Sequence, residues 1–135
     1  INVRDYVNEL LHTIFSSFTE KYINLKSEIE EILLDSKTAI PLGLIINEVA
    51  TNAIKYGFDT GAEPVFSVTL KESTDQELYI LTLSNNGRPF PEDIDLNNPN
   101  TLGLQLISVL TSQIKGNLKL ERAPHPVFTI RFPKE

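Results

Sequence analysis

Two pairs of alternating segments follow one another almost directly along the chain, and they restrict the fold more than any other feature. The first pair reads VFSVTLKE and ELYILTLS (65–72 and 77–84), joined by STDQ, and the second reads GNLKLE and HPVFTIRFP (116–121 and 125–133). Apolar and polar residues alternate in each segment, as in strands. Strands with such short connections pair antiparallel. The sequence therefore predicts an α+β fold with an antiparallel-rich sheet.

Helical spacing of apolar residues predicts three helices around these strands. They span 3–20, 36–56 and about 101–115, the last beginning at Thr101 or Leu102, and Pro41 is expected to produce an early turn or a kink in the second. INLKSEIEEI (23–32) alternates like a strand with one wet face. We therefore expect a single domain over 1–135, with the helices covering one face of the sheet.

Composition excludes several classes of site. The 135 residues include 12 basic and 18 acidic ones, a net charge of −6, which does not suit binding to a nucleic-acid backbone. There is no cysteine, so disulfides and thiolate metal sites are excluded. No apolar run reaches the length of a membrane span. The chain has no methionine and starts at Ile1, so we expect it to be a piece of a longer protein.

A polar stripe runs along the second predicted helix. Glu48, Asn52 and Lys55 are spaced four and three residues apart, which places an acid, an amide and an ammonium on one side. Taken alone, such a triplet is typical of a solvated helix face. Leu44 and Ile54 border the stripe, however, and the opposite side is the predicted core face. This pattern favours a stripe that lies under another part of the molecule.

A seventeen-residue connection, 85–101, separates the third predicted strand of the chain from the last helix. It contains five asparagines and three prolines, and loops of this length in compact domains usually have a function. Gly103 lies near the start of the helix that follows, where backbone N–H groups can approach an anion. Many ordinary helices begin in this way, so the signal is weak by itself.

Taken together, these features resemble the ATP-binding domain of sensor histidine kinases, in the superfamily that includes gyrase and mismatch-repair ATPases. The matching segments are AIPLGLIINEVATNAIKYGF (39–58) at the N-box, LSNNGRPFPEDID (83–95) at the first glycine box, and TLGLQLISVLTSQIKGNLKL (101–120) at the second. The resemblance implies the Bergerat fold, a two-layer sandwich of a mixed, mostly antiparallel sheet with helices on one face. It also implies ATP and Mg²⁺ as ligands, with 85–101 as the lid.

The resemblance assigns roles to the stripe. Asn52 matches the amide that ligates Mg²⁺ through its oxygen, and Glu48 matches an acid that accepts a proton or orients the attacking group. Lys55 would reach the phosphates and Tyr56 would flank the ribose or adenine. No GxxxxGK[ST] loop is present, so the phosphates must be held elsewhere. The candidates are Gly103 and the backbone N–H groups around it, those of Leu102, Leu104 and Gln105.

The first glycine box departs from the family pattern D-x-G-x-G. The aligned residues are Asn85, Asn86, Gly87, Arg88 and Pro89. Asn85 stands where the family's aspartate accepts a hydrogen bond from the adenine amino group. Its amide oxygen still accepts, at an expected loss of about 1 kcal/mol. Pro89 lacks an N–H and any positive φ, so the loop is expected to leave by another path, with Arg88 facing solvent.

Other expected features are missing or altered. APHPVFTIRF replaces the family's Gly-Thr pair before the last strand, so that threonine contact is not expected. His12 has none of the surroundings of a phosphoacceptor and is expected on a helix surface. His125, between two prolines, suits neither an acceptor nor a metal site.

The resemblance implies the catalytic domain of a two-component kinase. Its partners would be a phosphoacceptor-histidine dimerisation domain in the same protein and a response regulator, with no nucleic acid and no membrane contact by this domain. The expected location is cytoplasmic, in a parent protein that can be membrane-anchored, and the fragment is expected to be monomeric. Two alternatives stay open: a degenerate kinase domain used for docking, and a protein-serine kinase of the anti-sigma type. A gyrase-like clamp fits less well.

Overall fold

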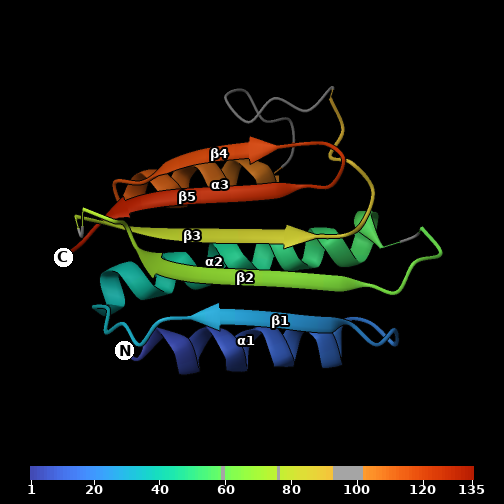
Figure 1. Cartoon of the computed structure of the whole chain (residues 1–135), viewed down its shortest axis with the longest axis horizontal. Helices are drawn as coiled ribbons and strands as arrows, with labels where there is room; N and C mark the ends of the chain where they lie inside the picture. The colour runs from blue at the N-terminus through green and yellow to red at the C-terminus, as the bar shows by residue number, and fades with distance from the viewer. Residues whose placement is uncertain (59, 76, 93–101) are drawn as a thin grey trace.

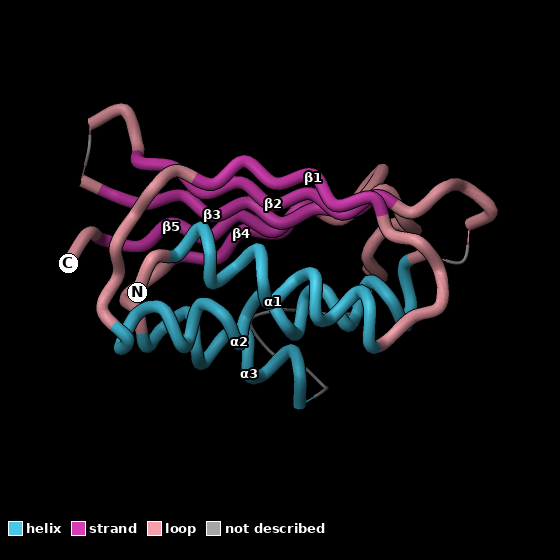
Figure 2. Tube along the Cα trace, turned by 90° about the horizontal axis from the view of Figure 1, so that it is seen from below, coloured by secondary structure: helices cyan, strands magenta, loops and turns pink. Residues whose placement is uncertain are grey.

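A five-stranded mixed sheet with three helices on one side forms the domain (Figures 1 and 2). The structure, a computed structural model, describes residues 1–58, 60–75, 77–92 and 102–135. The strand order is β1-β2-β3-β5-β4. The strands are β1 (Asn24–Ile29), β2 (Val65–Glu72), β3 (Leu78–Asn85), β4 (Asn117–Glu121) and β5 (Val127–Pro133). The predicted α+β class with helices on one face is confirmed.

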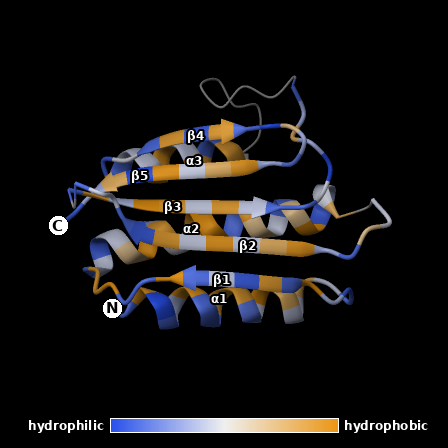
Figure 3. Cartoon of the chain, viewed as in Figure 1, coloured by the Kyte–Doolittle hydropathy of each residue, from blue (hydrophilic) through white to orange (hydrophobic). Residues whose placement is uncertain are grey.

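Antiparallel pairing dominates the sheet, as the short connections predicted. β2 pairs with β3, β3 with β5, and β4 with β5, all antiparallel. Only β1 runs parallel to its neighbour β2 among the described strands, because α2 connects the two. Figure 3 shows β1 as largely hydrophilic beside the more hydrophobic central strands, consistent with its place at an edge.

Alternation along each central strand separates a buried face from a polar one. The inward residues of β2 and β3 are Phe66, Val68, Leu70, Tyr79, Leu81 and Leu83. Asn85 continues the same series at the end of β3 and is also buried. The face of the sheet that meets the helices therefore ends in a polar side chain at one corner, instead of another apolar one.

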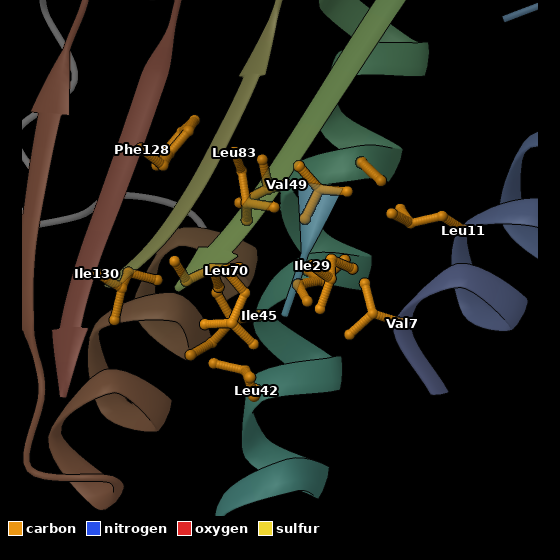
Figure 4. Close-up of a cluster of buried hydrophobic side chains, with 14 of the residues drawn as sticks. Val7, Leu11, Ile29, Leu42, Ile45, Val49, Leu70, Leu83, Phe128 and Ile130 are labelled. Carbon is orange, nitrogen blue, oxygen red and sulfur yellow. The ribbon is translucent and has the colours of Figure 1, made fainter. Parts of the chain in front are cut away.

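The three helices are α1 (Val3–Ser17), α2 (Ser36–Asn52) and α3 (Leu102–Gln113). Asn2 and Asp35 cap the first two, since the Asn2 side chain accepts from the Asp5 N–H (3.2 Å) and that of Asp35 from the Lys37 N–H (2.9 Å). Side chains from α1, α2 and the inner sheet face fill the core, as Figure 4 shows for Val7, Ile45 and Leu83. None of the described helices is long and apolar enough to cross a membrane.

The central helix differs from its prediction at its end. α2 runs through Pro41 and then gives way to a π-helical turn, η1 (Ala53–Gly57), where regular α-helix was expected to residue 56. The Phe58 N–H bonds the Ala53 carbonyl, five residues back, at 3.2 Å. Such wider turns inside helices are often found at functional sites.

Gly43 permits close packing of α2 on α1. A Cβ there would lie 2.8 Å from Cζ of Tyr6 and closer still to its hydroxyl. Gly43→Ala gains about 1 kcal/mol of helix propensity but must displace the Tyr6 ring. We expect a net loss of about 1–2 kcal/mol in the free energy of unfolding, measured by urea denaturation. Gly43→Ala/Tyr6→Ala should lose less than the two single variants combined; additive losses would show that this contact is not the cause.

Candidate functional site

Glu48 and Gly103 bring α2 and the start of α3 together. Glu48 is half-buried, and a Cβ added to Gly103 would lie 2.5 Å from its Oε2. Any side chain at position 103 would therefore displace the carboxylate. The sequence singled out both residues separately, and the structure shows that they are in contact.

Asn52 lies one helical turn after Glu48 and is also half-buried. Lys55 and Tyr56 belong to η1 and are exposed, Tyr56 by 72%. Among the residues that the structure describes, none bonds the side chain of Glu48, Asn52 or Lys55 through a hydrogen bond or an ion pair. No enclosed side-chain nitrogen or oxygen lacks a partner in these residues, so the polar atoms of the stripe reach solvent and are accessible to a ligand.

Asn85 is the centre of a second cluster, where β3 ends and the long connection begins. Its side chain is 8% exposed, and its Oδ1 accepts a hydrogen bond from the Gly87 N–H at 2.8 Å. Gly57 lies against the same oxygen, since a Cβ there would be 3.4 Å from Oδ1. The Arg88 N–H in turn donates to the Gly57 carbonyl at 2.9 Å. The end of η1 and the start of the connection are thus joined around one amide.

Two further residues fix the start of the connection, and the sequence analysis gave neither of them this role. The Asn86 Oδ1 accepts from the Val65 N–H and its Nδ2 donates to the Glu63 carbonyl, both at 2.8 Å. His125 Nδ1 lies 2.7 Å from the Gly87 carbonyl oxygen, so this nitrogen carries the hydrogen and donates. Asn-Asn-Gly after a strand was a visible turn signal, but the partners are distant in sequence and no local pattern reveals them.

After Pro89 the chain runs along the turn between β4 and β5. The Phe90 N–H donates to the Arg122 carbonyl at 2.9 Å, and the Arg122 guanidinium lies 5.5 Å from the centre of the Phe90 ring. Arg88 is exposed, as expected, and His12 is exposed on α1. The rest of the predicted lid, 93–101, lies outside the described residues.

The structure also limits the phosphate-binding candidates. Leu102 begins α3. The Leu104 side chain is 3% exposed and belongs to the core, so this side chain does not face a ligand. Two open depressions on the surface lie elsewhere, one lined by Arg4, Glu28 and Lys71 among others and one at the end of α1. We place the site at the stripe because the half-buried Glu48 of α2 meets Gly103 of α3 there.

The described ranges contain no group of side chains suited to hold a metal ion without other ligands. No cluster of three or more histidine, cysteine, aspartate or glutamate side chains occurs there. Any cation at the stripe would take most of its ligands from a bound molecule and water, as Mg²⁺ commonly does with nucleotides.

Known proteins give a consistent comparison. No protein family model matches the chain. It is 27% identical over 100 residues to the blue-light-activated histidine kinase 2 of Erythrobacter litoralis, which covers 74% of this chain and 28% of that protein. It is 26% identical over 138 residues to the sensor histidine kinase PdtaS of Mycobacterium tuberculosis, covering 84% of this chain and 27% of that protein. The chain thus spans little more than a quarter of these relatives.

Solved structures agree with the sequence relatives. The histidine kinase domain of the Erythrobacter litoralis EL346 protein superposes with a TM-score of 0.89 at 23% identity, over 98% of this chain and 61% of that one. The catalytic domain of histidine kinase ThkA gives 0.77 at 19% identity, over 99% and 93%. The chain has the fold of histidine kinase catalytic domains.

The Asn85 cluster predicts unequal tolerance of its two glycines. A Cβ at Gly87 would lie 2.7 Å from Asn85 Oδ1 and still closer to the Gly57 carbonyl, whereas one at Gly57 makes ordinary contacts. Gly87→Ala should lower the free energy of unfolding by about 2–4 kcal/mol, because the backbone must move. Thermal denaturation measures both variants. Gly57→Ala, the matched control, should lower the free energy of unfolding by less than about 1 kcal/mol. Equal losses would contradict the close approach.

Proposed function

We propose that the chain is the ATP-binding catalytic domain of a sensor histidine kinase, and that it transfers the γ-phosphoryl group of ATP to a histidine on a neighbouring dimerisation domain. The observation that supports this most is the contact of the half-buried Glu48 of α2 with Gly103 of α3, in a chain with this fold. Asn52, one turn later, is also half-buried, and neither side chain has a partner among the described residues.

The stripe suits a nucleotide and Mg²⁺. Asn52 supplies an amide oxygen, the kind of hard ligand that Mg²⁺ accepts, and Glu48 adds a carboxylate one turn away. Bound Mg²⁺ would neutralise charge on the phosphate oxygens. Asn52 is therefore the proposed metal ligand, with Lys55 at the phosphates. Backbone N–H groups at Leu102, Gly103 and Leu104 are proposed as further phosphate donors.

The other residues of the proposed site serve the base and sugar. Tyr56 is exposed and free to flank the ribose or the base. Asn85 and Gly87 form the buried corner where β3 ends, and we place the edge of the base against them. Hydrogen bonds join Asn85, Gly87 and His125 before the nucleotide arrives, and such preorganisation lowers the cost of ordering on binding.

Phosphoryl transfer in this site would depend on alignment. The bond from the γ-phosphorus to the bridging oxygen breaks and ADP leaves with the electron pair, while a bond forms to a nitrogen of the acceptor imidazole. Glu48 is placed to orient that ring and to take its proton. Holding donor and acceptor in line supplies most of the rate gain in such reactions.

The same proposal extends to the partners and the location of the domain. The phosphoryl group would pass from the histidine to an aspartate of a response regulator. The acceptor domain would lie in the remainder of a longer protein, because the chain spans little more than a quarter of its relatives. Because ATP is the proposed donor, the proposed location of the domain is the cytoplasm.

One observation favours a second function. Asn85 replaces an acid at the base corner, and its oxygen is already used by Gly87. A degenerate domain that docks partners without binding nucleotide would tolerate this change. The two functions differ in whether the stripe binds a nucleotide and Mg²⁺ together.

Calorimetric titration with an unhydrolysable ATP analogue, with and without Mg²⁺, tests the proposal. Asn52→Ala should weaken Mg²⁺-dependent binding at least tenfold, about 1.4 kcal/mol, because it removes a metal ligand. Asn117→Ala is the control, since Asn117 is exposed on β4, away from the site. Binding that is unchanged in Asn52→Ala, or no binding to the unmodified chain at millimolar nucleotide, would favour the docking function.

A further inference from the structure

Glu48 brings a negative charge to the start of α3, a helix with no acidic residue in its own first turn. The Glu48 Oε2 lies beside Gly103, 2.5 Å from the position that a Cβ on this residue would occupy. The N-terminal end of a helix has about half a positive elementary charge, which attracts such a carboxylate but does not cancel its charge. A net negative charge therefore remains where α2 meets α3.

No cation of the described residues neutralises this charge, since none of them forms an ion pair with Glu48. Lys55, the cation of the stripe, lies seven residues further along the chain, a rise of about 10 Å along the helix axis. This separation exceeds the Debye length of about 8 Å at physiological salt, so Lys55 compensates Glu48 only weakly. Because Glu48 is half-buried, water screens its charge less than that of an exposed carboxylate.

We propose that Glu48 makes the site select metal-bound over metal-free nucleotide, because its carboxylate repels phosphates that carry no divalent cation. The inference rests on the proposed function, in which the phosphates lie between Asn52 and the start of α3. Repulsion between like charges a few ångströms apart is strong where protein replaces part of the water. A nucleotide that carries Mg²⁺ presents two positive charges together with its phosphates, so the same carboxylate no longer opposes its binding.

Glu48 and Asn52 then contribute to this selection in opposite ways. Asn52 offers an uncharged oxygen, which strengthens binding of the metal-bound nucleotide and has little effect on the metal-free one. Glu48 weakens binding of the metal-free nucleotide. Loss of the Asn52 amide should therefore weaken binding in the presence of Mg²⁺, whereas loss of the Glu48 charge should strengthen binding in its absence. This difference in direction separates the two roles by experiment.

Calorimetric titration of the 135-residue chain with an unhydrolysable ATP analogue, once in Mg²⁺ and once in EDTA, tests the inference. Glu48→Gln keeps the shape of the side chain and removes its charge. It should bind the metal-free analogue about tenfold more tightly than the unmodified chain does, with less than about a threefold change in Mg²⁺. Glu28→Gln removes the same charge from exposed β1, on the sheet face away from the helices, and should change neither affinity.

Glu48→Asp is the second variant, with thermal melts to confirm that each protein is folded. It keeps the charge and should keep most of the Mg²⁺ dependence of the unmodified chain.

Three results would overturn the inference and leave the nucleotide site standing. In the first, the metal-free analogue binds Glu48→Gln no more tightly than the unmodified chain. In the second, the Mg²⁺ dependence falls only because the metal-bound analogue binds more weakly, which would make Glu48 a metal ligand. In the third, Glu28→Gln or Glu48→Asp shows the same gain as Glu48→Gln. Absence of binding by every variant, with and without Mg²⁺, would instead contradict the proposed function itself.

Discussion

Burial of one side of α2 against the sheet determines where every polar group of the candidate site lies. The residues that make this contact are less than 5% exposed: Leu42, Ile45, Ile46, Val49, Ala50 and Ala53. Each buried aliphatic side chain contributes about 1.5–3 kcal/mol, far more than exposed polar contacts do. The rotation of the helix about its axis is fixed by this apolar side, and the 3.6-residue period then directs Glu48 and Asn52 toward α3. The core thus holds the stripe in place, and no residue in the described ranges bonds the side chains of Glu48, Asn52 or Lys55.

A second rigid unit lies at the end of β3, and it depends on polar contacts. The Asn85 side chain, the Gly57 carbonyl and His125 each bond the segment that follows the strand. These partners come from β3, η1 and the turn before β5, so the corner forms only when all three have docked. The start of the long connection is therefore held by hydrogen bonds from three separate elements, even though its sequence is rich in turn residues.

Sequence patterns predicted the elements well because each pattern has a local cause. The alternation of apolar and polar residues predicted the strands, and the 3.6-residue spacing of apolar residues predicted the helices. The short connections predicted the antiparallel pairs. The contact between Glu48 and Gly103 could not be predicted from local patterns, since the two residues are far apart in the sequence. The π-turn in η1, the bonds of Asn86 and the role of His125 could not be predicted, because they depend on tertiary contacts that no local pattern encodes. Asn85 was singled out from the sequence, but the orientation of its amide required the position of the Gly87 N–H.

An amide at position 85 also changes the stability of the fold when no ligand occupies this corner. A carboxylate there would be more than nine-tenths buried with one backbone N–H as its described donor, and burial of an ionised group with so little compensation is expensive. The neutral amide satisfies the same N–H without that desolvation cost. An acid at this position must recover the cost through the ligand, so its binding site is less stable when empty and more dependent on the base when full. Asparagine avoids this conflict, because the corner keeps its hydrogen bond to Gly87 without burying a charge.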